Sequence, residues 1–188
     1  MGRPEVTSHG AIEQAAFRLF RQRGFDQTTL DDIAGEVGVA RRTLSRYYPS
    51  KNDIPWGQFD RTLDGFRAIL AATPTDLPLW ESVHQGVLAF NDFPDDAEPP
   101  HRDRMRLILT TPALQAHSVL RYGQWRAVIA EHVALRLGQA ADDVLPRTVG
   151  HVSLALALTA YEAWLDDDHT HLPALLDQAM AGLRAHLA

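Results

Sequence analysis

The chain has 188 residues, of which 45% are hydrophobic, so it is long enough to bury a core as one large domain or two small ones. It contains no cysteine, which excludes disulfides and thiolate metal sites and is compatible with a reducing cytoplasm. The net charge is −6, but residues 1–54 carry eight basic and seven acidic side chains, whereas residues 55–188 carry ten and seventeen. A general positive field for nucleic acid is therefore excluded, and any such binding must depend on a local basic cluster.

We expect neither a secretory signal nor a membrane segment. The N-terminal MGRPEVTSHG lacks an apolar core, and no run reaches the ~18 apolar residues needed to span a bilayer. These features predict a cytoplasmic protein. Arg3 in the N-terminal arm could enter a DNA minor groove, and a plain disordered tail is the alternative.

The first predicted helix runs from about Ser8 to Arg23. Its apolar residues recur at helical spacing and form a single stripe: Ile12, Ala15, Ala16, Leu19 and Phe20. Gly24 ends the helix, and Phe25 can fold back onto the small core. We interpret this stripe as structural.

Two short helices with a glycine turn follow. Thr29 can cap the first of them, Asp31 and Asp32 favour its positive N-terminus, and Gly38 can end it in a left-handed conformation. Val39 then lies where it can plug the space between the two helices. This spacing is typical of a helix-turn-helix.

The second short helix, about Arg41 to Tyr48, has two faces. Leu44 and Tyr48 share one side, and Arg42 and Arg46 point the opposite way. Guanidinium groups can pair with guanine edges, while hydroxyls and further arginines can hold phosphates. The donors available for such contacts are Arg41, Arg42, Thr43, Ser45 and Arg46. The alternative is a solvated charged helix of any all-helical protein.

The segment YYPSKNDI predicts the start of a longer helix. Ser50 can cap it, with Asp53 completing a variant capping box, and the helix is expected to run to about Leu70 and to connect two domains. Lys51, the only lysine in the chain, would lie at this N-terminus, where its ammonium and backbone N–H groups could hold a phosphate.

The remainder predicts further helices without strand alternation, about nine helices in all. The expected ranges are 79–90, 101–109, 113–137, 142–165 and 173–187. The last two are strongly apolar, which indicates either assembly with a second copy or completion of a monomer core.

These motifs resemble the TetR family of bacterial transcriptional regulators, and RRTLSRYYPSKNDIPWGQFD is most similar to regulators associated with mycofactocin gene clusters. The resemblance covers about Ser8 to Trp56. It implies an all-α protein with a three-helix DNA-binding domain over residues 1–54 and a larger effector-binding and dimerisation domain over residues 55–188.

Carried over by position, the resemblance also implies functions for single residues. Thr29 would contact a phosphate, Lys51 would hold the DNA backbone, and the reading surface would consist of Arg41, Arg42, Thr43, Arg46 and Tyr47. The family often has Ser or Thr where this chain has Ala40, and Tyr or Phe where it has Ser45. The last two helices would form a homodimer that represses from a near-palindromic double-stranded DNA operator.

A small-molecule effector pocket is the least defined feature. Bulky and polar side chains of the second domain could line it: Trp80, Phe90, Met105, His117, Tyr122, Trp125, His151 and Trp164. The resemblance makes a largely apolar effector plausible, with acyl thioesters as one class, although most of these side chains could equally be core.

Two other functional classes stay open at this stage. One is a helical enzyme with an unrecognised site, although no catalytic motif and no cofactor fingerprint is present, so we expect no cofactor. The other is a constitutive DNA-binding protein without an effector. The segment DDDHTH, residues 166–171, resembles a metal site but equally a hydrophilic turn, and we expect no metal.

Overall fold

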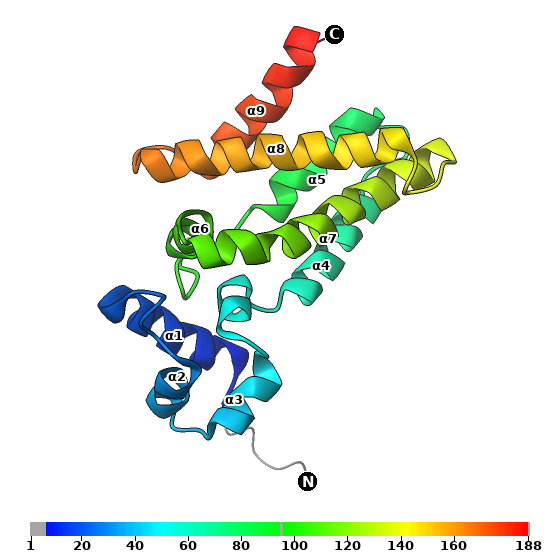
Figure 1. The fold of residues 1–188 in the computed structure, drawn as a ribbon. Helices are drawn as coiled ribbons and strands as arrows, with labels where there is room; N and C mark the ends of the chain where they lie inside the picture. Colours follow the sequence, from blue (N-terminus) through cyan, green and yellow to red (C-terminus); the bar gives the residue numbers. More distant parts are fainter. Residues whose placement is uncertain (1–6, 95, 188) are drawn as a thin grey trace. The chain divides into compact units, whose positions relative to one another are not determined.

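The computed structural model describes residues 7–94 and 96–187, and these residues form helices without any strand, as the sequence predicts. The elements, shown in Figure 1, are α1 (His9–Arg23), α2 (Leu30–Val37), α3 (Arg41–Tyr47), η1 (Lys51–Trp56), α4 (Phe59–Ala71), α5 (Leu79–Phe90), α6 (His101–Thr110), α7 (Pro112–Leu137), α8 (Val144–Asp166) and α9 (Leu172–Leu187). The predicted Arg3 contact lies outside the described residues.

Residue contacts divide the chain into two compact units. The first contains α1, α2, α3, η1 and α6, and the second contains α4, α5, α8 and α9; α7 changes unit after His117. This division differs from the sequence-based boundary after residue 54, because it assigns α6 to the same unit as the helix-turn-helix.

The core of the first unit is the one that the helical spacing predicts. Ile12 and Phe20 of α1 and Ile33 of α2 are buried, as are Leu44 of α3 and Tyr48, which directly follows α3. Val39 is half-buried and packs against this cluster, as expected for the residue that follows the turn. Apolar burial of this kind, at about 25 cal/mol per Å2, is what holds such short helices in place.

The prediction of one continuous helix from Ser50 to Leu70 is wrong. The chain forms the short 3-10 helix η1, turns at Gly57 with φ 59° and ψ −145°, and begins α4 only at Phe59. Pro55 lies inside η1 and cannot donate a backbone hydrogen bond, and Gly57 supplies a positive φ that other residues rarely adopt. The two residues together explain the break.

The second unit is held by aromatic and small side chains. Phe66 of α4 stacks on Trp125 of α7 at 5.4 Å between ring centroids and lies 4.4 Å from the ring of Phe90. At Gly150, α8 approaches α7 so closely that an added Cβ would lie 2.7 Å from the carbonyl oxygen of Arg126. Helix α9 packs on both α8 and α5. Across the described ranges, we find no helix whose length and apolar content would let it cross a membrane.

Candidate nucleic-acid interface

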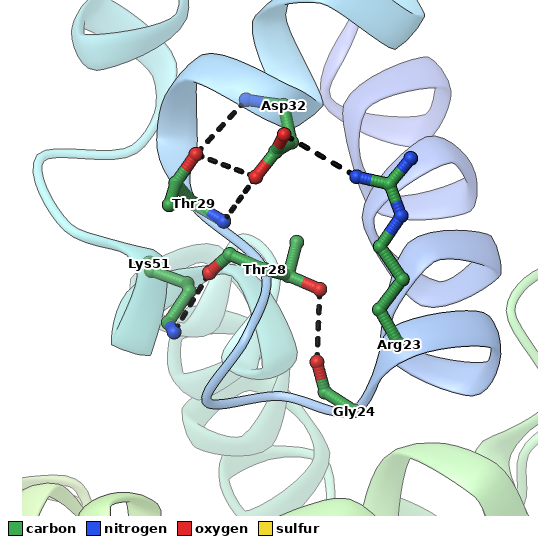
Figure 2. Close-up of polar contacts among 6 residues, drawn as sticks. All are labelled: Arg23, Gly24, Thr28, Thr29, Asp32 and Lys51. Carbon is green, nitrogen blue, oxygen red and sulfur yellow. Dashed lines mark hydrogen bonds and ion pairs between the residues drawn. The ribbon is translucent and has the colours of Figure 1, made fainter.

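Helix α2 begins with a reciprocal cap, drawn in Figure 2. The Thr29 backbone N–H donates to Asp32 Oδ2 at 2.8 Å, and the Asp32 N–H donates to Thr29 Oγ1 at 3.1 Å. The Thr29 hydroxyl also donates to Asp32, at 2.6 Å, and this bond is the main cause of the lowered pKa of Asp32. The cap predicted at Thr29 is confirmed. Its hydroxyl hydrogen is engaged within the protein, so the phosphate contact stays a prediction that requires this bond to open.

The turn between α2 and α3 also has the predicted form. Gly38 has φ 76° and ψ 30°, a left-handed conformation, and its N–H returns to carbonyls of α2. Ala40 precedes α3 and gives it no side-chain cap. The start of α3 is therefore fixed by the turn and by burial of Leu44, with no help from a capping side chain.

Two arginines of α3 make no interaction with other described residues. Arg42 and Arg46 are exposed on the side opposite Leu44 and Tyr48, and neither has an ion-pair or hydrogen-bond partner within the described ranges. Arg41 is different, because its Nη1 lies 2.7 Å from Asp31 Oδ2 of α2. Both groups of that pair are about 60% exposed, so the ion pair is weak and open to competition by DNA.

The other side chains predicted on the reading surface are less available. Thr43 and Ser45 are half-buried. The Tyr47 hydroxyl donates to the backbone carbonyl of Thr7 at 2.9 Å, and its ring packs edge-on against His9. Tyr47 therefore holds the start of the described chain, and its hydrogen is not free for a phosphate.

The Lys51 ammonium has hydrogen-bond partners within the protein, and its phosphate contact stays a prediction. Lys51 does begin η1, and Ser50 and Asp53 form the predicted box, with the Ser50 N–H and hydroxyl both donating to Asp53 Oδ2. The ammonium, however, points into the turn between α1 and α2 and donates to backbone carbonyls of Phe25 and Thr28 at 2.7 and 2.8 Å. Its donors serve the protein's own backbone, which the sequence spacing alone did not indicate.

Sequence reasoning missed a buried polar network below α3. Glu13 of α1 accepts a hydrogen bond from the Tyr48 hydroxyl at 2.5 Å and forms an ion pair with Arg104 of α6 at 2.5 Å. Arg104 also donates to the Pro55 carbonyl at 2.6 Å. Burial, assisted by the bond to Glu13, raises the pKa of Tyr48. The available signal was Glu13 itself, because a carboxylate on the same helix face as Ala16 and Phe17 requires a partner.

The sequence also matches known proteins along its length. A domain described as "Bacterial regulatory proteins, tetR family" matches residues 12–54, and one described as "MftR C-terminal domain" matches residues 77–188. MftR of Mycobacterium tuberculosis, whose name assigns it to the regulation of mycofactocin biosynthesis, is 43% identical over 179 residues, covering 95% of this chain and 90% of that protein. The chain belongs to the TetR family of bacterial transcriptional regulators.

One further relative is similar in sequence, and one solved structure is similar in fold. TcmR of Streptomyces glaucescens, a helix-turn-helix transcriptional regulator, is 27% identical and covers 92% of this chain and 80% of its own. The solved structure of the fatty acid degradation regulator FadR from Bacillus halodurans shares the fold, with a TM-score of 0.66, 16% identity, and coverage of 93% and 96%. This TetR-family protein is thus a DNA-binding transcriptional regulator and not an enzyme.

The residues predicted to line an effector pocket have varied surroundings in this TetR-family regulator. Phe90 and Trp125 pack on Phe66 as core. Met105 and His117 belong to the first unit, where His117 Nε2 lies 3.0 Å from Asp53. The remaining four lie in the second unit: Trp80, Tyr122, His151 and Trp164. Burial raises the pKa of Tyr122, and Trp164 packs edge-on against Tyr161.

A groove of about 350 Å3 lies elsewhere, between α7 and the start of α8. Of the predicted pocket residues only His151 lines it, together with Gly123, Arg126, Ala127, Glu131, Ala141, Asp142 and Arg147. Arg126 lies 3.0 Å from the His151 ring. The mixture of charges in the groove does not resemble an apolar pocket, so the effector site stays a prediction.

The segment DDDHTH forms the turn between α8 and α9. The His169 N–H donates to Asp167 Oδ1 at 2.9 Å, and the Thr170 hydroxyl donates to the Asp167 carbonyl at 2.7 Å. Within residues 7–94 and 96–187, no three His, Cys, Asp or Glu side chains gather as a metal site would require. The turn is explained by its own hydrogen bonds.

Proposed function

We propose that this regulator represses transcription as a homodimer that binds a near-palindromic operator, with one α3 in each of two successive major grooves. The observation that carries the proposal is the exposure of Arg42 and Arg46 on the side of α3 that faces away from its buried anchors, Leu44 and Tyr48. Two such helices about one helical turn apart on the duplex, ~34–36 Å, would fit the grooves together. A DNA-bound regulator of this kind acts in the cytoplasm.

Half-buried apolar side chains on α8 and α9 support dimerisation through these helices. On α8 they include Leu154 and Leu158, and on α9 they include Leu175 and Leu183. In one copy each of these side chains keeps part of its apolar surface in water, which a twofold-related copy would remove. Sedimentation or mass photometry at nanomolar concentration tests the dimer, and a monomer that binds its operator at full strength would contradict the proposal.

Arginine variants test the reading surface. Arg42→Ala and Arg46→Ala should each weaken operator binding by roughly 1–3 kcal/mol and relax the preference for one base. Arg61→Ala is the matched control, because Arg61 is an exposed arginine on α4 of the other unit. Fluorescence anisotropy with operator and single-base variants measures both effects. Equal affinities for all four proteins would show that α3 does not read the DNA.

We further propose that the target genes are those of mycofactocin biosynthesis and that a small, largely apolar molecule releases the operator. The relationship to MftR, which extends through the second unit, supports the choice of genes. The abundance of aromatic side chains there, among them Trp80 and Trp164, is compatible with an apolar effector of the acyl-thioester class. An effector releases DNA only to the extent that it prefers the conformation that does not fit the operator.

Footprinting and thermal melts test these two points separately. Protection of the promoter upstream of the mycofactocin genes is expected without effector and should disappear with it. A ligand present at 100 times its dissociation constant should stabilise the protein by about 2.7 kcal/mol. If acyl thioesters of several chain lengths neither shift the melt nor release DNA, the protein binds another effector or none, and the latter would make it a constitutive DNA-binding protein.

A further inference from the structure

The groove between α7 and the start of α8 holds more side-chain donors than acceptors. Arg126 Nη1 lies 3.0 Å from His151 Nδ1. A guanidinium only donates, so Nδ1 accepts this bond, which leaves an N–H donor on Nε2. The Arg147 guanidinium is exposed and has no ion-pair or hydrogen-bond partner in the part of the chain that the structure describes. Glu131, one of two carboxylates in the groove, already pairs with Arg67 of α4 at 3.1 Å. Most donors of the groove therefore lack an acceptor in the same copy.

The charges within α8 oppose the dipole of their own helix. Arg147 lies near its start, and Glu162 and Asp166 lie near its end; the first turn has no acidic residue and the last turn has no basic one. A helix N-terminus favours anions and a C-terminus favours cations, so this arrangement does not stabilise an isolated helix. Asp142 and Asp143 precede the helix, and the carboxylate of Asp143 accepts a hydrogen bond within its own turn. The polarity of α8 therefore requires another explanation.

The polar residues at the two ends of α8 lie on one exposed face. All four are exposed, and at ~100° per residue they fall within an arc of about 100°, well away from the buried Ala157. Arg147 and His151 form the basic end of this face, and Glu162 and Asp166 form its acidic end. The two ends are roughly 28 Å apart at ~1.5 Å per residue. They are too distant to neutralise each other within one copy.

An antiparallel pair of α8 helices from two copies would bring opposite ends together. Suppose that a twofold axis crosses α8 midway between residues 156 and 157. His151 then lies level with Glu162 of the partner subunit, and Arg147 lies level with Asp166 of the partner subunit, because the members of each pair are equally far from the axis. A single register therefore matches both pairs, and the twofold axis generates each pair twice.

The middle of the same face suits close contact in this register. Ala155 is exposed and Leu158 is half-buried, and Ala155 lies level with the partner's Leu158. A small residue opposite a large one lets two helices interdigitate. Val144, at the start of the face, is 82% exposed, so its apolar surface also gains from a covering helix. Apolar contact and charge matching thus agree on one alignment.

We propose that the homodimer contains an antiparallel α8–α8 contact whose register is set by charge, with the basic end of each copy against the acidic end of the other. The acidic end would also offer carboxylates to the groove donors, including Arg126. Exposed ion pairs contribute little affinity each, so the charges specify orientation and register, while apolar burial supplies most of the binding. This inference rests on the homodimer of the proposed function.

Charge reversal tests the register. Arg147→Glu and Asp166→Arg each place like charges together twice in their own homodimers, so each should raise the dimer dissociation constant at least about fivefold. A mixed dimer of the two variants regains two attractive pairs. Its share, measured by native mass spectrometry after subunit exchange, should lie well above the half that random exchange gives. Both substitutions suit the helix dipole, so neither threatens the folding of a single copy.

Arg61→Glu and Asp76→Arg are the matched controls. They make the same changes of charge at exposed residues of α4 and of the segment that follows it. Both controls should dimerise like the wild type and exchange at random. If Arg147→Glu and Asp166→Arg behave like the controls, or weaken the dimer without favouring the mixed one, the register is overturned.

Disulfide formation gives an independent readout that needs no change of charge. The chain contains no cysteine, so Ala155→Cys in one copy and Leu158→Cys in the other introduce the only thiols. Level residues of paired helices come within the ~4.4–6.8 Å between Cα atoms that a disulfide requires. The mixture should therefore cross-link faster than either variant alone, and equal rates would contradict the register. A wild type that stays monomeric would refute the homodimer itself, whereas a wild-type dimer with random exchange and equal cross-linking refutes only the register.

Discussion

Replacing Gly150 by alanine is expected to destabilise the second unit, because α8 approaches α7 too closely there to admit a methyl group. The added Cβ would lie 2.7 Å from the Arg126 carbonyl oxygen, about 0.7 Å inside the 3.4 Å at which ordinary contact begins. A backbone oxygen cannot rotate away as a side-chain end can. The two helices would therefore have to separate, and their neighbouring contacts would weaken with them.

The size of the effect follows from two opposing contributions. Overpacking a tight helix contact costs about 1–3 kcal/mol, and alanine in place of glycine within a helix returns about 0.8–1 kcal/mol. Because the clash is with a backbone atom, the upper part of the overpacking range applies, about 2–3 kcal/mol, and we expect a net loss of about 1–2 kcal/mol for Gly150→Ala. Gly65→Ala in α4 is the matched control, since Gly65 is exposed and an added Cβ there meets nothing within 4 Å. It should gain about 0.5–1 kcal/mol.

Thermal unfolding at fixed protein concentration measures both variants. Gly150→Ala should lower Tm by about 2–8 °C, whereas Gly65→Ala should raise it. Hydrogen exchange resolved by peptide should place the change in α7 and α8. If the Tm of Gly150→Ala equals or exceeds that of the wild type while Gly65→Ala behaves as expected, the close approach of α8 to α7 does not require glycine at this position.

Three further predictions concern charged and titratable groups of the first unit. Arg104→Ala should destabilise the first unit by about 3–5 kcal/mol, because the buried Glu13 carboxylate loses its cation. Hydrogen exchange of the α1 amides measures this loss of stability. Unchanged exchange rates would mean that water replaces the ion pair. Asp31→Asn should strengthen binding to operator and to unrelated DNA alike by about 0.5–1 kcal/mol, since it releases Arg41 and removes a carboxylate. Fluorescence anisotropy measures both affinities. Tighter binding to the operator alone would contradict this prediction. Burial lowers the pKa of His101 to about 3, whereas its value in the unfolded chain is 6.5. Between pH 3 and pH 6.5 the folded state therefore binds fewer protons than the unfolded state. The free energy of unfolding then falls as the pH drops below 6.5, by up to ~1.4 kcal/mol per pH unit. Urea titrations from pH 7.5 to 4.5 should show a shallower fall for His101→Gln, and an equal fall in both proteins would exclude this histidine.

Local signals in the sequence were sufficient for most of the fold. Helix α2 begins after Thr29 and ends before Gly38, as the capping chemistry of these two residues predicts. The spacing of Leu44 and Tyr48 correctly indicated the buried side of α3. The break at Gly57 was missed because a proline in the first turns of a helix is tolerated, so Pro55 alone gave no reason to end it. The φ of the glycine two residues later decided the outcome.

The candidate site was only partly predictable, because tertiary contacts determine which donors are free. Helical spacing correctly assigned Arg42 and Arg46 to the exposed side of α3. It could not show that the Tyr47 hydroxyl reaches Thr7, since that contact joins residues 40 positions apart. Nor could it show that Lys51 reaches the turn before α2. A sequence motif indicates which residues carry donors, whereas hydrogen bonds between distant parts of the chain determine which of those donors are available to DNA.

The carboxylate of Asp31 beside Arg41 affects how a repressor of the proposed kind distributes itself along a chromosome. A genome offers ~10^6–10^9 competing sites, and retention on them grows with the number of phosphates that a protein neutralises. A DNA-binding surface whose exposed cations are partly neutralised by their own neighbours is held only weakly by this background. More copies of the protein then stay free of nonspecific DNA. Occupancy of the promoter can therefore change as soon as operator affinity changes, because little protein has to dissociate from other sites first.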